Sequence, residues 1–427
     1  MGAMIMIMTV RDKRLWYSVG RTFVVLAVAA LLVSSAWAAE KVVYSFTGGI
    51  DGANPATNLT FDSAGNAYGT TAAGGDSGFG TVFKLSPNPD GGWTESVLYS
   101  FSGFSDGLSP HGGVIFDDAG NLYGTTVAGG DGGICAGDGC GVVFQLAPNP
   151  DGSWTQSVIY NFTGGDDGFG PGNGLVRFAK SGALFGATPD GGANGVGVVY
   201  ELKQNQNGKW RFKVLHTFTG GQDGAVGSLG SLLLDAEGNV YGIAELGGVY
   251  GAGVVYRLRQ RHDGTWKFRT LYAFKGLPDA GFPYGGLTSD EAGNLYGTTY
   301  YGGANGVGSA YKLTQHANDM WSERVIYSFK GGKDGASTTT TLVFDGAGNL
   351  RGTTSEGGDA GCSCGVIFEL TPSGNGMWKE SVSHRFRSVP DGAYSYYGMT
   401  YDAAGKLYGT TAAGGIHNQG AIFKFTP

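Results

Sequence analysis

Gly120-Asn121-Leu122-Tyr123-Gly124-Thr125 is the stretch that decides the fold, because close copies of it recur along the chain. The position of its tyrosine recurs at residues 68, 123, 185, 241, 296, 351 and 408. A second phrase, Tyr-Ser-Phe-x-Gly-Gly-x-Asp-Gly in its fullest form, places Phe at residues 46, 101, 162, 218, 274, 329 and 386. Self-similarity at a fixed period, here roughly 55 residues, is the sequence signature of a repeat architecture. The chain therefore holds seven repeats.

Each repeat reads as four short antiparallel strands. In the first repeat we predict them at residues 59–61, 67–71, 81–85 and 93–101. Residues 81–85 alternate between apolar and polar side chains, as in a strand with one buried face, and Asp and Gly between the first two strands favour a tight turn. Four antiparallel strands in a repeat of this length fit a propeller blade, whereas helical repeats would show an apolar period of about 3.6 residues.

The two ends of the repeat array predict a closed ring. The last repeat stops after its third strand, at residues 423–427, and a lone fourth strand precedes the first repeat at residues 42–46. Together the two pieces complete one blade, which leaves no unpaired strand edge where the chain ends meet. We therefore predict an all-β fold, a seven-bladed β-propeller of four-stranded antiparallel blades that the N-terminal strand closes. An open β-solenoid is the alternative.

The composition agrees with short strands and tight turns. The 427 residues include 81 glycines, which disfavour long helices because each costs about 1 kcal/mol relative to Ala. An aromatic content of 13 % excludes a disordered chain, because these side chains need a core. We expect that core to include the blade tryptophans, at residues 93, 154, 210, 266, 321 and 378. The net charge of −7, without a basic patch, argues against nucleic acid as a partner.

The N-terminal residues predict export. Basic residues at positions 11, 13, 14 and 21 precede an apolar run at residues 22–33, and Ala36-Trp37-Ala38 has the small-x-small pattern of a signal-peptidase site. We expect residues 1–38 to be a cleaved signal peptide and residues 39–427 to be one propeller domain that is secreted, periplasmic or at the cell surface. A retained N-terminal anchor is the alternative. No other segment is long and apolar enough for a membrane span.

Four phrases that recur in a fixed order resemble the GloVer tandem repeat. In the second repeat these phrases are Tyr99-Ser100-Phe101, Asp106-Gly107, residues 118–126 and residues 141–146. The resemblance covers the whole predicted mature chain. It implies an exported bacterial protein of a group often joined to varied C-terminal surface anchors, largely without an assigned activity, and it supplies no catalytic residues. The chain ends at Pro427 without a sorting segment, so we do not expect it to carry such an anchor.

One face of the ring is the expected site. In propellers, the loops before the first strand and between the second and third strands share a face, at the mouth of the central channel, where sites usually lie. Several side chains break the repeat pattern there, and we take them as ligand-binding candidates. They are His111, Tyr284, Tyr300, Tyr301, Tyr396 and Tyr397. Tyrosines beside a few acids suit sugar rings, although ordinary loop variation would also produce such differences.

Three carboxylates on the same face are the catalytic candidates. Asp190 and Glu245 are expected in equivalent loops of adjacent blades, and Glu356 lies two blades further on. Glycoside hydrolysis uses two carboxylates about 5–10 Å apart. No nucleophile-elbow, zinc-protease or phosphate-loop motif occurs. We therefore predict a non-catalytic, monomeric binding protein for an extracellular glycan or surface protein. A polysaccharide-active hydrolase or lyase is the alternative, and a structural spacer is a third reading.

An aspartate recurs in the loop before each blade and raises the question of a metal. These residues are Asp51, Asp106, Asp167, Asp223, Asp279, Asp334 and Asp391. Seven carboxylates on one face suggest Ca²⁺, but each loop offers a single carboxylate, so we expect the side chain to close its own turn. The six histidines are scattered without zinc-ligand spacing. We therefore expect no metal and no cofactor.

The four cysteines form two close pairs, Cys135 with Cys140 and Cys362 with Cys364. In an exported chain such pairs predict local disulfides. The two pairs fall in blades that are not neighbours, so pairing between them is not expected. Binding of a soft metal by Cys362 and Cys364 is the alternative.

Overall fold

The computed structural model describes residues 39–131, 133–135, 137–227, 230–374 and 376–426. The predicted signal peptide, residues 1–38, lies outside the described residues. Residues 40–426 form one compact unit. In the part of the chain that the structure describes, no helix is long and apolar enough to cross a membrane.

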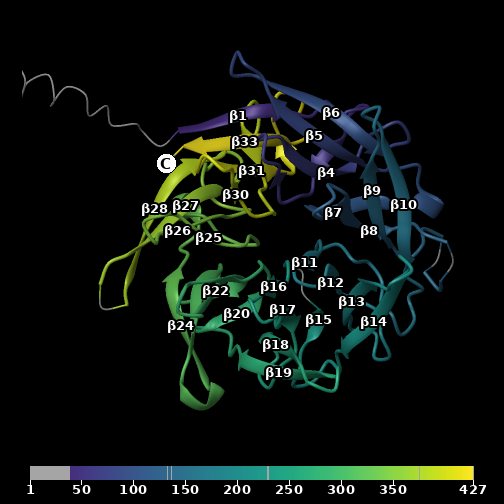
Figure 1. Ribbon diagram of the computed structural model, residues 1–427. Helices are drawn as coiled ribbons and strands as arrows, with labels where there is room; N and C mark the ends of the chain where they lie inside the picture. The colour runs from purple at the N-terminus through teal and green to yellow at the C-terminus, as the bar shows by residue number, and fades with distance from the viewer. Residues whose placement is uncertain (1–38, 132, 136, 228–229, 375, 427) are drawn as a thin grey trace, which may run out of the picture. The chain divides into compact units, whose positions relative to one another are not determined.

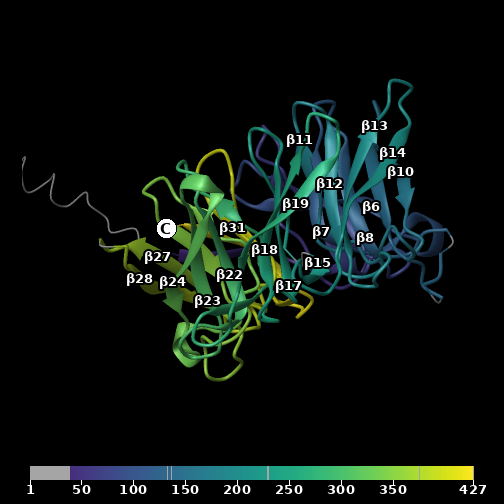
Figure 2. The ribbon, with the colours of Figure 1, turned by 90° about the horizontal axis from the view of Figure 1, so that it is seen from below.

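Seven antiparallel sheets follow one another in chain order around a common axis, and each corresponds to one repeat (Figure 1). Figure 2 shows the same sheets turned by 90°, with hairpin loops projecting beyond the strand ends. The predicted seven-bladed β-propeller is confirmed.

The first four blades contain β2–β19. Blade 1 contains β2 (Ala53–Pro55), β3 (Thr60–Phe61), β4 (Ala67–Ala73), β5 (Thr81–Pro87) and β6 (Trp93–Ser100). Blade 2 contains β7 (Leu108–Phe116), β8 (Leu122–Ala128), β9 (Val142–Pro148) and β10 (Trp154–Asn161). Blade 3 contains β11 (Val176–Phe178), β12 (Ala183–Thr188), β13 (Val198–Gln204) and β14 (Trp210–Thr217). Blade 4 contains β15 (Ala225–Gly227), β16 (Leu233–Leu234), β17 (Val240–Leu246), β18 (Val254–Gln260) and β19 (Trp266–Ala273).

The last three blades contain the remaining strands. Blade 5 contains β20 (Ala280–Pro283), β21 (Thr288–Ser289), β22 (Leu295–Gly302), β23 (Ser309–Gln315) and β24 (Trp321–Ser328). Blade 6 contains β25 (Val343–Phe344), β26 (Leu350–Thr353), β27 (Val366–Pro372) and β28 (Trp378–Arg385). Blade 7 contains β30 (Thr400–Tyr401), β31 (Leu407–Thr411), β33 (Ala421–Thr426) and β1 (Ala39–Ser45). A small sheet pairs β29 (Gly392–Ala393) with β32 (Ala413–Gly414), and short 3-10 turns are η1 (Phe104–Asp106), η2 (Ala317–Asp319) and η3 (Gly332–Asp334).

Ring closure by the N-terminal strand is confirmed. The strand order of blade 7 is β1-β33-β31-β30, so the first strand of the chain takes the outer place beside the last (Figure 1). Just beyond β1, the Phe46 N–H donates to the carbonyl of Gly420 at 3.0 Å. On the inner side, the Thr410 hydroxyl donates to the Thr57 carbonyl at 3.0 Å, which joins blade 7 to blade 1.

The innermost strand of several blades is interrupted, which the sequence analysis did not predict. In blade 1, β2 and β3 both pair with β4, through Ala53 with Ala73 and Thr60 with Tyr68. Asn54 within β2 has a φ of 50°, a conformation that an alternating strand pattern does not reveal. Of the residues between the two short strands, Asn58 faces the centre of the ring, whereas Ala56, Thr57 and Leu59 are buried.

The core lies between neighbouring blades. Phe101, in the loop after the outer strand of blade 1, is fully buried against Phe144 of blade 2, with ring centroids 5.2 Å apart. The six blade tryptophans belong to this core as expected, each half-buried and packed against one of its clusters. Trp93 begins an outer strand, where its ring packs edge-on against Tyr408 of blade 7 at 5.7 Å. A side chain at the start of the outer strand keeps one side toward solvent.

The recurring aspartates close their own turns, as predicted. Each accepts a hydrogen bond from the backbone N–H four residues earlier, as Asp106 does from Ser102 at 2.8 Å. Each also accepts from the ring side chain seven residues earlier, as Asp106 does from the Tyr99 hydroxyl at 2.9 Å. We call each such aspartate, its ring partner and the facing side chain of the next outer strand a blade junction. The ring partners, in order from Asp51 to Asp391, are Tyr44, Tyr99, Tyr160, His216, Tyr272, Tyr327 and His384.

Candidate functional site

A cavity of about 390 Å³ lies where the inner segments of all seven blades converge. Most of its side chains come from equivalent positions, the fifth to eighth residues after each loop aspartate. We call it the axial cavity. Its polar and aromatic lining includes Asn58, His111, Asn173, Ser231, Tyr284, Thr339, Thr341, Tyr396 and Tyr397.

Glycines bring the backbones close together around this cavity. Gly112 has a φ of +80°, and a Cβ there would lie 2.1 Å from the backbone nitrogen of Gly174 in the next blade. Only glycine fits such a position. The repeat therefore narrows the ring at its centre, and the larger side chains that replace glycine in some repeats define the shape of the cavity.

Four of the six predicted binding residues line the axial cavity: His111, Tyr284, Tyr396 and Tyr397. The His111 and Tyr397 rings meet edge-on with centroids 6.5 Å apart. Burial lowers the pKa of His111 to about 4, so its imidazole is neutral at physiological pH. Burial also raises the pKa of Tyr397, which keeps its hydroxyl protonated and able to donate.

The other two predicted tyrosines lie outside the lining. Tyr300 packs against Tyr284, with ring centroids 5.9 Å apart, and so supports a lining residue. Tyr301 is 51 % exposed and packs against Phe282 at 5.8 Å. These neighbouring residues therefore have different surroundings, since consecutive side chains of a strand point to opposite faces.

Two lining residues that sequence reasoning missed had a readable signal. The seventh residue after the loop aspartate is glycine in five repeats but Asn58 and Thr341 in the other two. The Asn58 Oδ1 atom is buried without a hydrogen-bond partner. A buried acceptor in this state is costly unless something donates to it. The same comparison between repeats that found His111 would have found Asn58.

The three predicted catalytic carboxylates do not belong to the described lining of the axial cavity. Asp190 and Glu245 are half-buried, and burial raises the pKa of both. Neither shift has the other carboxylate among its causes. Burial, followed by the charge of Glu245, raises the pKa of Tyr284. Glu245 therefore lies close enough to Tyr284 to affect its pKa, outside the described lining of the cavity.

Glu356 is exposed and accepts a hydrogen bond from the Ser337 hydroxyl at 3.3 Å. Burial, and then neighbouring groups that include the charge of Glu356, raises the pKa of Tyr396. Glu245 and Glu356 thus each lie near one lining tyrosine, outside the lining itself. Among the described residues, the lining itself contains no Asp, Glu, Lys or Arg.

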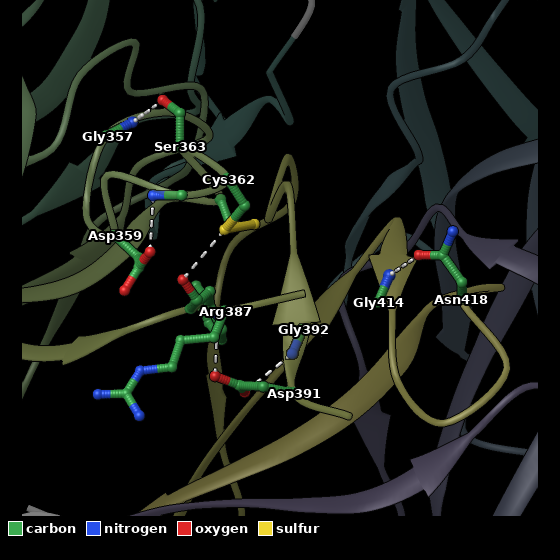
Figure 3. The surroundings of a disulfide bond; sticks show 12 residues. Gly357, Asp359, Cys362, Ser363, Arg387, Asp391, Gly392, Gly414 and Asn418 are labelled. Atoms are coloured by element: carbon green, nitrogen blue, oxygen red, sulfur yellow. Dashed lines mark hydrogen bonds between the residues drawn. A yellow bond between two sulfur atoms is a disulfide. The ribbon is translucent and has the colours of Figure 1, made fainter. Parts of the chain in front are cut away.

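Both predicted disulfides are present, Cys135–Cys140 and Cys362–Cys364. Figure 3 shows Cys362 in the loop between β26 and β27, beside the loop that carries Arg387 and Asp391. In the same loop the Ser363 hydroxyl accepts a hydrogen bond from the Gly357 N–H at 2.9 Å. Disulfides persist in oxidising surroundings, so the two bonds indicate an extracellular environment.

The family model of the Gloeobacter/Verrucomicrobia repeat matches residues 33–232, 136–364 and 227–427. The chain belongs to this repeat family. The matches overlap and together cover residues 33–427. No curated protein matches the sequence.

Solved structures offer only distant likenesses. One, described as an oxidoreductase (glucose dehydrogenase) from Thermus thermophilus, has a TM-score of 0.42 and 12 % identity, covering 91 % of this chain and 100 % of that one. Another, from Dyadobacter fermentans, has a TM-score of 0.41 and 15 % identity, covering 80 % and 96 %. At such scores neither likeness says anything about activity.

Proposed function

We propose that this member of the repeat family is an exported binding protein that holds a ring of an uncharged glycan in the axial cavity. The observation that carries the proposal is the set of aromatic residues that converge there, Tyr284, Tyr396, Tyr397 and His111, on a cavity of about 390 Å³. Ligand pockets measure roughly 300–1,000 Å³ and combine apolar walls with a few placed polar groups. The axial cavity meets both criteria.

The chemistry of the lining favours a sugar. Aromatic faces stack on the apolar face of a sugar ring, and tyrosine adds a hydroxyl that donates and accepts. The buried Asn58 Oδ1 lacks a donor, which a ligand hydroxyl would supply. Ser231 and Thr339 add further hydroxyls at the same cavity. These groups bind without any charge on the ligand.

The absence of charge in the described lining argues against an ionic ligand. Neutral His111 adds no positive charge above about pH 4, the value to which burial lowers its pKa. A charged sugar in this cavity would be desolvated without an oppositely charged partner, which is costly. Neutral glycans therefore fit better than uronic acids or sulfated sugars.

A glycan array followed by calorimetry tests the proposal. Tyr284→Ala should weaken binding of the glycan found on the array about tenfold or more, because stacking area and a hydroxyl are lost. Tyr301→Ala is the matched control, since Tyr301 lies on the same face outside the cavity and should leave affinity unchanged. Equal losses in both variants, or no bound glycan on the array, would count against the axial cavity as the binding site.

A hydrolase or lyase is the second candidate, supported by the raised pKa values of Asp190 and Glu245. A general acid needs a raised pKa, and burial supplies it here. Release of reducing ends from a polysaccharide, abolished by Glu245→Gln while binding persists, would establish this candidate. Binding without release, with Glu245→Gln costing only about 1–2 kcal/mol of affinity, supports the binding protein.

A further inference from the structure

Three metal-ligating side chains meet where the ring closes, at the junction between blades 6 and 7. Glu40 comes from the N-terminal strand β1, His384 from the outer strand β28, and Asp391 from the loop after β28. The His384 Nε2 atom lies 3.0 Å from Asp391 Oδ2 and 3.8 Å from Glu40 Oε2. One potential ligand atom from each residue lies within 4.8 Å of the other two. Sequence spacing did not suggest this cluster, because its members come from opposite ends of the chain.

The other six blade junctions have the same framework but different chemistry. The side chains facing the loop aspartates are Glu95 at Asp51, Gln156 at Asp106, Phe212 at Asp167, Phe268 at Asp223, Glu323 at Asp279 and Glu380 at Asp334. Where the ring partner is tyrosine, the junction lacks an imidazole. At the remaining histidine junction, Phe268 stacks on His216 with ring centroids 3.9 Å apart. Among the described junctions, the one at Asp391 alone combines histidine with two carboxylates.

The Glu40 carboxylate is buried beside a second carboxylate, and one of its two oxygen atoms is unpartnered. Its side chain is 8 % exposed, and Oε1 has no hydrogen-bond partner. Two buried carboxylates close together are costly to ionise unless a positive charge lies between them. The Arg387 backbone N–H donates to Asp391 at 3.1 Å, but its guanidinium extends away from this carboxylate in Figure 3. Among the residues that the structure describes, no Lys or Arg forms an ion pair with Glu40 or Asp391.

The distances suit a small tetrahedral ion. Zinc binds nitrogen and oxygen at about 2.0–2.1 Å, which sets neighbouring ligand atoms about 3.3 Å apart in a tetrahedron. The two distances from His384, 3.0 and 3.8 Å, lie on either side of that separation. Ca²⁺ takes six to eight oxygen ligands, whereas imidazole with carboxylates suits Zn²⁺ and its transition-metal neighbours.

We propose that Glu40, His384 and Asp391 bind one divalent transition-metal ion of the zinc class, which fastens the ring-closing strand β1 to blade 6. The ion replaces the hydrogen bond between His384 and Asp391 with two coordination bonds and brings a positive charge to the buried Glu40 carboxylate. A water molecule completes the tetrahedron. The site lies at a blade junction rather than in the axial cavity, so it stands independently of the proposed glycan binding.

Cobalt and zinc together test the site on the untagged, chelator-treated protein. One equivalent of Co²⁺ should give the visible absorption of tetrahedral cobalt, and Zn²⁺ should abolish that absorption. Saturating Zn²⁺ should raise the thermal unfolding midpoint by several degrees, because the ion binds only the folded ring. The absence of both the tetrahedral spectrum and the zinc-dependent rise in the unmutated protein would overturn the proposal.

The residue combinations at the other blade junctions suggest substitutions that the fold should tolerate. His384→Tyr recreates the Tyr327–Asp334–Glu380 junction, and Glu40→Phe recreates His216–Asp223–Phe268. Each should remain folded but lose the cobalt spectrum and the rise in midpoint with zinc. His216→Tyr is the matched control and should retain both. Retention of both signals in His384→Tyr, or their loss in His216→Tyr, would place the metal elsewhere and refute this site.

Discussion

The blade junctions and the axial cavity are built from the same seven repeats but use them in opposite ways. At the junctions, every repeat supplies an aspartate with the same two hydrogen bonds, from a ring side chain and from a backbone N–H. Around the axis, equivalent positions hold His111, Tyr284, Thr339 and Tyr396. The junctions keep the same aspartate and hydrogen bonds in every repeat, whereas the axial positions carry different side chains from one repeat to the next.

The difference shows how to interpret a repeat protein. A residue kept in every repeat serves the repeat, because each blade has the same neighbours to satisfy. A residue that departs from the pattern has a local cause. At the axis the departures gather around one cavity, and at the junctions the combination of Glu40 and His384 marks the point where the ring closes. We therefore expect junction variants to change stability and axial variants to change binding.

The largest effect should come from removing the strand that closes the ring. Deleting residues 41–46 takes β1 out of blade 7, exposes the edge of β33 and removes Phe46, which is fully buried. We expect the thermal unfolding midpoint to fall by roughly 10 °C or more, or the protein to fail to fold. Ile50→Ala, at a nearby residue that is 73 % exposed, should change the midpoint within error. A full-length midpoint in the deletion variant would refute the closure argument.

The next largest effect should come from a single junction. Asp167 is buried and accepts from the Tyr160 hydroxyl at 2.9 Å, the Thr163 N–H at 2.9 Å and the Thr163 hydroxyl at 2.6 Å. Asp167→Ala leaves these donors without their acceptor and should cost about 3 kcal/mol of unfolding free energy. Guanidinium unfolding measures the loss, and binding of the glycan should be unchanged at temperatures where the variant is folded. Unchanged stability would mean that water replaces the carboxylate.

The fold was predictable because the same sequence pattern occurs in seven repeats, so that each feature of a blade could be recognised several times. Blade number, strand count and ring closure followed from phrases that occur seven times, and the disulfides followed from close cysteine spacing. The half-burial of Trp93 was not predicted, since a pattern identifies an apolar position without showing whether it faces the core or the rim. The interruption between β2 and β3 and the positive φ of Asn54 within β2 are backbone features that alternation does not encode.

The candidate site was predictable only in part. His111, Tyr284, Tyr396 and Tyr397 line the cavity, and each could be singled out beforehand because departures from a repeat are visible in the sequence. Tyr300 packs against the lining residue Tyr284, whereas Tyr301 is exposed. This difference depends on the direction of each side chain, which only the structure gives. The approach of Glu40 to His384 depends on ring closure at atomic detail, which no local spacing reports.

A smaller effect, dependent on pH, should separate two kinds of junction. Burial, and then Asp279, raises the pKa of Glu323 to about 9, whereas Gln156 occupies the same place opposite Asp106. Because the folded protein retains this proton while the unfolded chain loses it near pH 4.5, stability should fall as pH rises from about 4.5 to 9.

Glu323→Gln replaces the titrating carboxyl with a neutral amide, so the variant does not lose stability through ionisation of this group. The substitution should raise the unfolding free energy at pH 8 by about 2 kcal/mol, with little change at pH 4. The reverse substitution, Gln156→Glu, should introduce the same loss of stability at alkaline pH. Denaturant unfolding at several pH values measures both variants. If the unfolding free energies of Glu323→Gln and of the unmutated protein change with pH in parallel, the prediction is wrong. The junction carboxyls would then be ionised in the folded protein, with their charge stabilised by other groups.

The smallest effect on stability should come from the axis, at Asn58. Its Oδ1 atom is buried without a partner, so Asn58→Ala removes an unsatisfied acceptor and should change the unfolding free energy by less than about 1 kcal/mol. If a glycan hydroxyl donates to that atom, the same substitution should weaken binding about fivefold, the effect of one hydrogen bond. Calorimetry and denaturant unfolding of one preparation measure both quantities. The contrary result is that Asn58→Ala loses as much stability as Asp167→Ala while its affinity for the glycan is unchanged. Asn58 would then have a structural role, and the difference between junction and axial residues would not hold at this position.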